Sequence, residues 1–452
     1  MTLLGAIFLG IDFLLVITLG RRGLLFAMAA SVPFFDSVMF DIGRVTIGLY
    51  WVPLIIYCIV AIIDGRIRFR RSVWAAAAFL VYAGLITVVG PFLFAGATVV
   101  AGDQVGNSAF NRVAQLDFSS SNVAQFAYLV LSCLFLMTRE SGADLRRCLQ
   151  VVFGVGVVVA LISVITPQLF PYDLFQNSSR NYYAAGATNY RAQGQFSEAS
   201  HLGGFALAAA AYALVGVFAA YRSAISRIGS AVLLAASLVL MAASASGTAV
   251  AGLALFAVVG FLVLVFRAVR ARARVSPLAV VLGLLMVPIL AVAVPWLYRW
   301  GIGVIDSRLA GNSDLLRNAA DQTTMALFSS SWGIGVGLGS TSASSLAVML
   351  LGSVGAVGTL LFAIATLSAI RASFRSREVV GGGVALLALL CASVVSLSLL
   401  SPLFWFLLGV TSTMLGRGKD PVHDVVGSFA AGGPERRNGR RSGSVRGTGL
   451  HA

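Results

Sequence analysis

The sequence predicts an all-α protein that folds as a polytopic transmembrane helical bundle of about 12–13 spans. Two observations support this prediction. Hydrophobic residues make up 58% of the 452 positions and charged residues only 11%, whereas a soluble domain carries roughly 25% charged residues. In addition, apolar runs of about 18 to 22 residues, long enough to cross a bilayer, recur along most of the chain and alternate with arginine clusters.

The apolar runs define the expected spans. They lie near residues 2–20, 23–40, 43–63, 72–95, 123–138, 148–166, 201–220, 228–244, 248–266, 276–296, 344–369, 379–399 and 403–416. The run 23–40 carries Pro33 and Asp36, so the first two segments could instead form a re-entrant or interfacial pair. The small polar residues Ser244 to Thr248 predict a tight outward-facing turn, since the stretch 228–266 is too long for one span.

The connections between the spans are of two kinds. One kind is short and basic, at 21–22, 66–71, 139–147, 222–227, 267–274, 371–377 and 417–419. The other is longer and rich in Asn, Ser, Gly and Gln, at 96–122, 167–200 and 297–343. Basic loops face the cytoplasm, so the long loops, with their short helices, are expected on the extracytoplasmic side. The membrane domain would cover 1–416, followed by a disordered, basic cytoplasmic tail over 417–452.

Several function classes fit the sequence poorly. The net charge of +15 is spread over short clusters instead of forming a patch, so nucleic acid is not an expected partner. The four cysteines lie in or beside apolar runs, and neither they nor the Asp, Glu and His residues have metal-ligand or redox spacing. No metal site and no cofactor are therefore predicted.

Arginines on the expected outer side break the charge bias of the chain. They are Arg44, Arg112, Arg180, Arg191, Arg299, Arg308 and Arg317. Two of them lie in the loop 167–200 and three in the loop 297–343, and no lysine accompanies them. Arginine without lysine favours planar, bidentate recognition of phosphate or carboxylate. A diphosphate at the membrane surface is one such ligand.

The loop 167–200 also carries groups suited to a sugar and to proton transfer. Stacking and amide side chains are provided by Tyr182, Tyr183, Tyr190 and Gln193. Ser197 to His201 predicts a helix start, with Ser197 as cap and Glu198 in the first turn. If Glu198 and His201 share a helix, their i,i+3 spacing places them on one face. They could then supply a general base, although a capping role for Glu198 and a span-end role for His201 remain alternatives.

The loop 297–343 is expected to contain a short amphipathic or interfacial helix over 325–328. A glycine string, Gly333 to Gly339, follows it. The string lacks the preceding strand and the Lys-Ser/Thr of a phosphate-binding loop, so it does not predict a nucleotide site. A flexible outer hinge is the expected role.

Three ordered motifs carry a family resemblance. Arg191 to Glu198 precedes a span, Ser244 to Thr248 forms an outer turn, and Ser307-Arg308 is followed at a distance by Gly335 to Ser340. Over about residues 120–400 their order, spacing and expected side resemble the O-antigen ligase / O-antigen polymerase (Wzy-type) superfamily of bacterial envelope proteins. Each motif alone is degenerate, and the ordered set carries the likeness.

The resemblance implies a function at the outer face of the bacterial inner membrane. In that family the donors are undecaprenyl-diphosphate-linked glycans, and outer arginines hold the diphosphate while a sugar hydroxyl attacks, without metal or nucleotide. Arg191 and Arg308 match the family's arginines, and Arg317 matches more loosely. Glu198 and His201 would join the catalytic group, whereas Arg180, Arg299, Arg317, the three tyrosines and Gln193 would bind substrate. Membrane lipids, a chain-length regulator and a flippase are the implied partners.

Two departures from the family's pattern are present, and the first favours a polymerase over a ligase. Ligases usually carry a histidine just beyond the Gly-x-Gly element, and none follows Gly337 in this loop; Gly247 also stands where many members have arginine. The alternatives are an O-antigen-type ligase acting on a lipid or protein acceptor, a polysaccharide or lipid-glycan transporter, and a non-catalytic assembly or division protein. Transport fits less well because the spans carry few charges, with Asp12 and Asp36 as the clearest exceptions.

Overall fold

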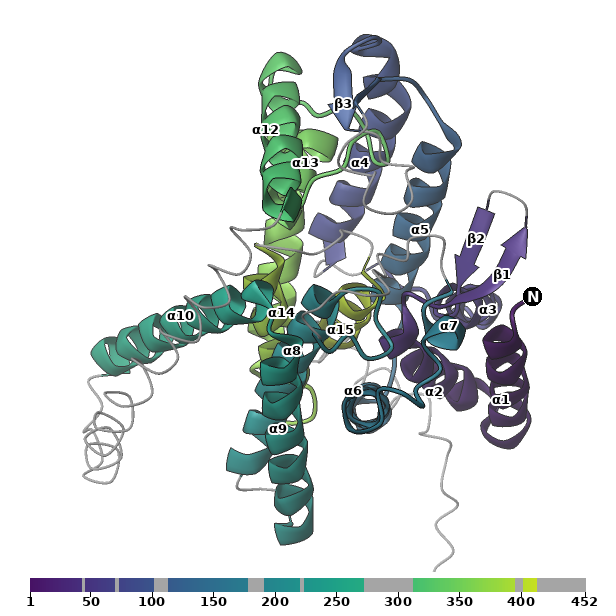
Figure 1. Ribbon diagram of the computed structural model, residues 1–452, viewed down its shortest axis with the longest axis vertical. Helices are drawn as coiled ribbons and strands as arrows, with labels where there is room; N and C mark the ends of the chain where they lie inside the picture. Colours follow the sequence, from purple (N-terminus) through teal and green to yellow (C-terminus); the bar gives the residue numbers. More distant parts are fainter. Residues whose placement is uncertain are drawn as a thin grey trace, which may run out of the picture. The chain divides into compact units, whose positions relative to one another are not determined.

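The computed structural model describes residues 1–42, 45–69, 73–100, 113–177, 191–219, 223–271, 312–394 and 401–412. Figure 1 shows its elements, which are mostly helices. Within these residues, six helices are long and apolar enough to cross a membrane. They are α4 (Trp74–Leu93), α5 (Ser120–Met137), α6 (Gly142–Ile165), α8 (Ala199–Phe218), α9 (Ala224–Ser244) and α13 (Leu346–Ser373). The prediction of a mostly helical protein with apolar helices long enough to span a membrane is confirmed.

The remaining helices are shorter or less apolar. The apolar ones are α1 (Leu3–Leu19), α3 (Trp51–Ile63), α14 (Val380–Ser393), α15 (Pro402–Ser412) and the described part of α10 (Gly247–Ala271). The others are α2 (Arg21–Ser31), the 3-10 helix η1 (Val32–Phe34), the short α7 (Tyr172–Phe175) and α12 (Asn312–Ser330). The expected span near 276–296 and the tail 417–452 lie outside the described residues.

Two small β-hairpins correct the all-α prediction. Strand β1 (Val38–Ile42) pairs antiparallel with β2 (Val45–Gly48), and β3 (Thr98–Val100) with β4 (Val113–Gln115). The first hairpin interrupts the expected spans 23–40 and 43–63. Pro33 has no N–H to continue α2, and the β-branched and aromatic residues that follow favour a strand. Helix α3 therefore begins only at Trp51.

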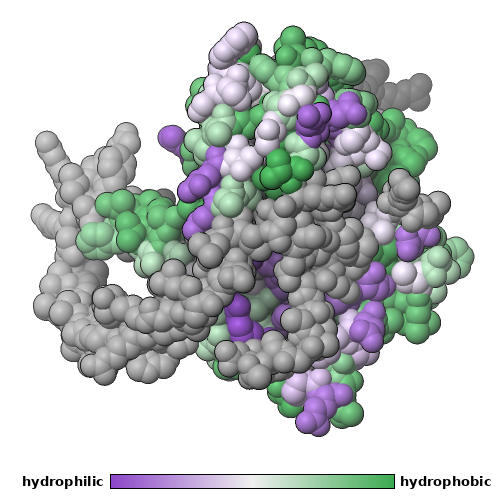
Figure 2. Space-filling model, turned by 45° about the horizontal axis from the view of Figure 1, so that its top comes forward, coloured by the Kyte–Doolittle hydropathy of each residue, from purple (hydrophilic) through white to green (hydrophobic). Residues whose placement is uncertain are grey.

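The core is built around helices that are buried on every side. Each residue of α15 is buried, including Phe404, Trp405 and Phe406, and α15 packs against α5, α13 and α14. A helix that is apolar all round must be enclosed by others in this way. Helix α9 is the opposite case, because Ile225, Ile228 and other apolar side chains lie exposed along it. On the face drawn in Figure 2, apolar side chains (green) reach the surface over large areas, as expected for lipid contact.

The turn between α9 and α10 is as tight as the sequence predicts. Helix α9 ends at Ser244, Ala245 takes a left-handed conformation with φ 42°, and α10 begins at Gly247. The start of α8 lies against this turn. A Cβ atom on Gly203 would stand 2.8 Å from the Cβ of Ser246, so glycine is required for α8 to approach α10 this closely.

The glycine string is a packed structural element, and the prediction of a flexible hinge was wrong. A Cβ atom at Gly335, Gly337 or Gly339 would stand 2.5, 2.9 or 2.7 Å from backbone atoms of other segments. All three residues have φ between 77° and 100°, a region that favours glycine. The loop is also anchored by hydrogen bonds, because Gly337 N–H donates to the Ser353 carbonyl at 2.8 Å and Asn122 Nδ2 to the Leu338 carbonyl at 2.6 Å.

Helices α12 and α13 also differ from the expected elements. The short helix expected at 325–328 is part of α12, a continuous helix of 19 residues. Helix α12 packs against α13 and strand β3. Helix α13 is kinked at Gly355, where φ is 67°. The Ile334 carbonyl approaches this point so closely that it would stand 2.2 Å from a Cβ atom there. The glycine loop and the kink therefore fit into one another.

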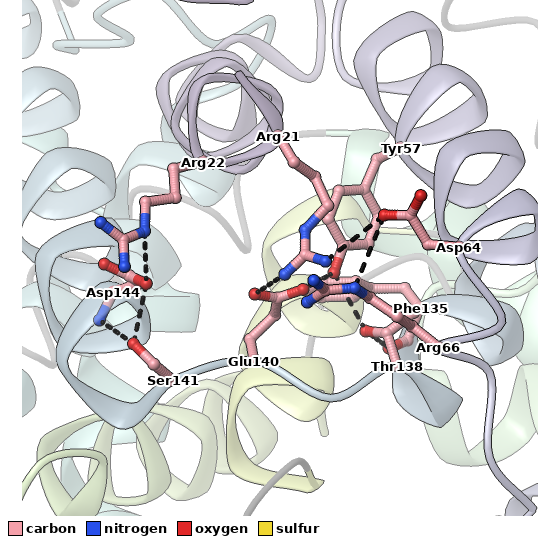
Figure 3. Close-up of polar contacts among 10 residues, drawn as sticks. All are labelled: Arg21, Arg22, Tyr57, Asp64, Arg66, Phe135, Thr138, Glu140, Ser141 and Asp144. Atoms are coloured by element: carbon pink, nitrogen blue, oxygen red, sulfur yellow. Dashed lines mark hydrogen bonds and ion pairs between the residues drawn. The ribbon is translucent and has the colours of Figure 1, made fainter. Parts of the chain in front are cut away.

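A network of charged and hydroxyl side chains joins three connections that the sequence assigns to the cytoplasmic side (Figure 3). Arg21, at the start of α2, binds Glu140 at 2.9 Å and Asp64 at 3.6 Å. Tyr57 of α3 donates a hydrogen bond to Glu140 at 2.6 Å. Glu140 lies between α5 and α6, so the network ties the α1–α2 turn to the end of α3 and to the α5–α6 connection.

The connections assigned to the outer side meet each other as well. Ser342 N–H donates to the Val100 carbonyl at 3.1 Å, which joins the third long loop to the first. Val38 N–H donates to Asn177 Oδ1 at 2.7 Å, which joins β1 to the second long loop, 167–200. The tertiary contacts thus group the connections into the same two sets as the arginine pattern does.

Candidate functional site

The candidate site surrounds the N-terminal end of α8. It is built from the turn after η1, the chain entering α8, the α9–α10 turn and α12. The segment that enters α8 is held by amide side chains: Gln176 Nε2 donates to the Gly194 carbonyl at 3.1 Å and the Phe196 carbonyl at 2.5 Å, and Gln195 Nε2 donates to the Gly156 carbonyl of α6 at 3.1 Å. These bonds fix the backbone that presents Ser197, Glu198 and His201.

His201 is paired with Asp36. The ring Nδ1 lies 3.1 Å from Asp36 Oδ2, and the same carboxylate oxygen accepts a hydrogen bond from Ser197 N–H at 2.9 Å. The two side chains are 21% and 14% exposed. The ring of Phe35 lies beside the imidazole, with centroids 5.3 Å apart. The carboxylate next to His201 is thus Asp36, and the predicted partnership of His201 with Glu198 is corrected.

Glu198 is paired with Arg317 of α12. The guanidinium Nη2 lies 3.1 Å from Glu198 Oε2, and Ser200 Oγ donates to the same oxygen at 2.5 Å. The predicted capping arrangement was wrong, because α8 begins at Ala199 and Glu198, at the cap position, makes no side-chain capping hydrogen bond. An extended backbone at Glu198, with φ −135° and ψ 146°, turns the carboxylate toward α12 instead.

Both carboxyl groups are ionised at neutral pH. Burial raises the pKa of Asp36, but the charge of His201, the hydrogen bond to its ring and the hydrogen bonds from Ser197 outweigh burial and lower it below the ordinary 3.8. Burial likewise raises the pKa of Glu198. His201, Arg317 and the hydroxyl of Ser200 outweigh that effect and the nearby charge of Asp36, so the net pKa lies below 4.5. The four charged groups therefore act as one electrostatic unit.

Arg191 lies at the α9–α10 turn. Its Nε donates to the Ser244 carbonyl at 3.3 Å, and the neighbouring Ala192 N–H donates to the Ala243 carbonyl at 3.1 Å. Two of the three motifs behind the family resemblance are therefore in direct contact. The buried Oε1 of Gln193 makes no hydrogen bond to a described residue, and neither do the buried hydroxyls of Ser246 and Thr248 at the start of α10.

Six of the residues singled out from the sequence lie outside the described residues. They are Arg180, Tyr182, Tyr183, Tyr190, Arg299 and Arg308. The structure brings Glu198, His201 and Arg317 together, and the hydrogen bond to Ser244 places Arg191 beside the α9–α10 turn.

Asp36 is the residue of the site that sequence reasoning missed. The sequence shows it as a charge within an apolar segment, whereas the loop 167–200 is where the sequence predicts a base. A charged residue in such a segment is a functional candidate in its own right. The separation of 165 residues between Asp36 and His201 explains why no local pattern links them.

The arrangement contains side chains suited to proton transfer and to anion binding. An aspartate–histidine pair can orient and charge an imidazole, and an arginine that is only partly engaged by one carboxylate keeps donors for an anion. Among the described residues, no cluster of His, Cys, Asp and Glu could hold a metal ion.

No protein-family model matches the chain, and no curated protein sequence matches it at a significant level.

Proposed function

We propose that this protein is a polysaccharide polymerase of the bacterial inner membrane. It would join undecaprenyl-diphosphate-linked oligosaccharide repeat units on the extracytoplasmic face by metal-independent glycosyl transfer. The resemblance to the O-antigen polymerase superfamily supplies the reaction, and the site at the N-terminal end of α8 supplies residues suited to it.

The contact between Glu198 and Arg317 carries the proposal. These residues belong to the two long loops that the charge pattern assigns to the outer side, and their charged groups lie 3.1 Å apart. An arginine from one loop is therefore held at the segment of the other loop that contains Arg191 and His201. Such convergence is what a diphosphate sugar would need, because its phosphates and its reacting carbon must be bound at the same time.

Chemically, the site would act by positioning and charge stabilisation. The lipid diphosphate is already a leaving group, so the protein needs to align the acceptor hydroxyl and stabilise the charge that develops on phosphate oxygen. Arg191 and Arg317, with Arg308 from the resemblance, would hold the diphosphate, and His201 would take the proton of the hydroxyl. Direct displacement predicts inversion at the anomeric carbon.

The orientation of the protein in the membrane is part of the same proposal. The basic connections would face the cytoplasm, and about 12–13 spans would put the α8 site at the outer surface. The grouping of connections by tertiary contacts supports this topology, since Arg21 contacts Asp64 and Glu140, and Glu198 contacts Arg317.

The test measures glycan chain length in cells and in detergent. Arg191→Ala and Arg317→Ala are each expected to abolish long glycan chains while the protein remains in the membrane, and Arg308→Ala is expected to do the same. Arg317→Lys should restore little activity, because lysine lacks the planar, bidentate donor geometry. The purified protein should lengthen undecaprenyl-diphosphate-linked oligosaccharide extracted from cells that lack it.

The control is Arg375→Ala, which removes an exposed arginine from a connection of the other set. It should leave the chain-length profile unchanged. Wild-type profiles from the Arg191 and Arg317 variants would overturn the proposal. Movement of the lipid-linked oligosaccharide across vesicles without any lengthening would instead favour transport.

A further inference from the structure

Asp36 lies outside the part of the chain that resembles the polymerase family, about residues 120–400, and yet it reaches the site. It follows the 3-10 helix η1 and precedes the first hairpin. One carboxylate oxygen of Asp36 lies 3.1 Å from His201 Nδ1 and accepts a hydrogen bond from the backbone N–H of Ser197 at 2.9 Å. The N-terminal segment therefore contributes a charged side chain directly to the start of α8.

The pair determines which ring nitrogen can exchange a proton. The low pKa of Asp36 means that its carboxylate carries no proton at neutral pH, so it can only accept a hydrogen bond. Nδ1 must then be the protonated nitrogen of His201. Nε2 makes no hydrogen bond to a described residue, and the side chain is 21% exposed. When the ring is neutral, the nitrogen opposite Asp36 is thus the one that can receive a proton.

We propose that Asp36 is a positioning residue that holds His201 as the general base of the glycosyl transfer, an inference that rests on the proposed function. Nε2 takes the proton of the acceptor hydroxyl as the acceptor oxygen bonds to the anomeric carbon. The bond from that carbon to the diphosphate oxygen breaks, and its electron pair leaves with the lipid diphosphate. His201 then releases the proton to water. Asp36 keeps its charge throughout and stabilises the imidazolium that forms.

The neighbouring charges single out Asp36 for this role. The charged groups that act on His201 are Asp36, Glu198 and Arg317. Glu198 and Arg317 are bound to each other at 3.1 Å, so their charges largely cancel. Asp36 is the carboxylate in direct contact with the ring, and its backbone partner Ser197 prevents it from turning away.

The experiment uses Asp36→Asn, which keeps the shape of the side chain and removes its charge. With undecaprenyl-diphosphate-linked oligosaccharide from cells lacking the protein as substrate, kcat should fall roughly 10- to 1000-fold and KM should change little, because a general base contributes about 10²- to 10⁴-fold. Without the carboxylate the imidazolium is less stable, so the activity that rises with pH should reach its half-maximum at a lower pH than in the wild type. A variant that only damaged the fold would not move this midpoint.

Two further variants sharpen the test. The double variant Asp36→Asn with His201→Ala should be no slower than His201→Ala alone, because residues that act as a unit are not additive. Asp41→Asn makes the same chemical change at an exposed position of β1 and should leave rate and pH profile unchanged.

Nitrogen-15 NMR of the imidazole in detergent gives a readout without turnover. His423 and His451 are first replaced by glutamine, so that His201 gives the signal. With Asp36 present the spectrum should show protonated Nδ1, and with Asp36→Asn it should show a mixture of tautomers.

The outcomes separate this inference from the proposed function. An unshifted pH midpoint and unaltered tautomer in Asp36→Asn would overturn the positioning role, even if the arginine variants abolish polymerisation. Additive losses in the double variant would do the same. If the wild-type protein does not lengthen the lipid-linked oligosaccharide, both the proposed polymerase function and the proposed role of Asp36 are overturned.

Discussion

At the scale of single residues, the charges around α8 are arranged so that each has a partner. Asp36 faces His201 and Glu198 faces Arg317, at 3.1 Å in both pairs. All four side chains are between 14% and 21% exposed. A half-buried charge retains part of its hydration and still interacts strongly with its neighbour. The two ion pairs therefore stabilise the entry to α8 while each side chain keeps some contact with solvent.

The ionisation of Asp36 and Glu198 makes stability depend on pH in a defined direction. Both have a lower pKa in the folded protein than their ordinary values of 3.8 and 4.5. Their stabilising contribution is complete above those values and is lost as the pH falls through the lower folded pKa. We expect the melting temperature in detergent to fall more on acidification below about pH 4 in the wild type than in Asp36→Asn with Glu198→Gln.

Asp41→Asn serves as the control for that comparison, because Asp41 is exposed. It should keep the acid sensitivity of the wild type. Equal acid sensitivity in the double variant would mean that these two carboxylates do not contribute as described.

At the scale of elements, glycines set how closely the helices approach. Gly335 and Gly355 meet where the loop 333–339 enters the kink of α13. Neither residue leaves room for a methyl group, and both have a positive φ. The sequence pattern of alternating glycines is compatible with a flexible hinge. The tertiary contacts make it a rigid seam between α4, α5 and α13.

The seam yields a prediction about stability. Gly335→Ala, Gly337→Ala and Gly339→Ala should each destabilise the protein by several kcal/mol, since the backbone is left-handed and backbone atoms occupy the space of the new methyl group. The matched control is Gly229→Ala inside α9, where no atom lies within 4 Å of the added Cβ. There alanine should be neutral or stabilise by about 0.5–1 kcal/mol. Thermal unfolding in detergent measures both, and equal effects at Gly229 and Gly337 would contradict the packing described.

At the scale of the whole membrane unit, the two sets of connections are each held together by polar contacts. The network around Arg21 is the most buried example, since Glu140 is 4% exposed and its partner Arg21 18%. Buried ion pairs are costly to break, because the charge that remains has no partner. This network therefore joins the α1–α2 pair to the rest of the bundle.

Replacing one member of that network should loosen the N-terminal helices. Glu140→Gln removes the charge that faces Arg21 and is expected to cost roughly 3 kcal/mol, with a lower melting temperature and faster proteolysis near α1 and α2. Arg147→Ala, which breaks a pair of 3.9 Å at an arginine that is 62% exposed, should change stability by less than about 1 kcal/mol. An equal loss in both variants would contradict a structural role for the Arg21 network.

The sequence by itself determined that the protein is mostly helical with apolar segments long enough to span a membrane, because such segments are visible in composition and run length alone. It also identified Glu198, His201 and Arg317 as candidates, because charged groups are conspicuous against an apolar background. The tertiary structure decided the partners: His201 binds Asp36 and Glu198 binds Arg317. It also made the glycine string a packed seam and the segment after Pro33 a hairpin. The two ion pairs join residues more than 100 positions apart, and no local periodicity encodes them.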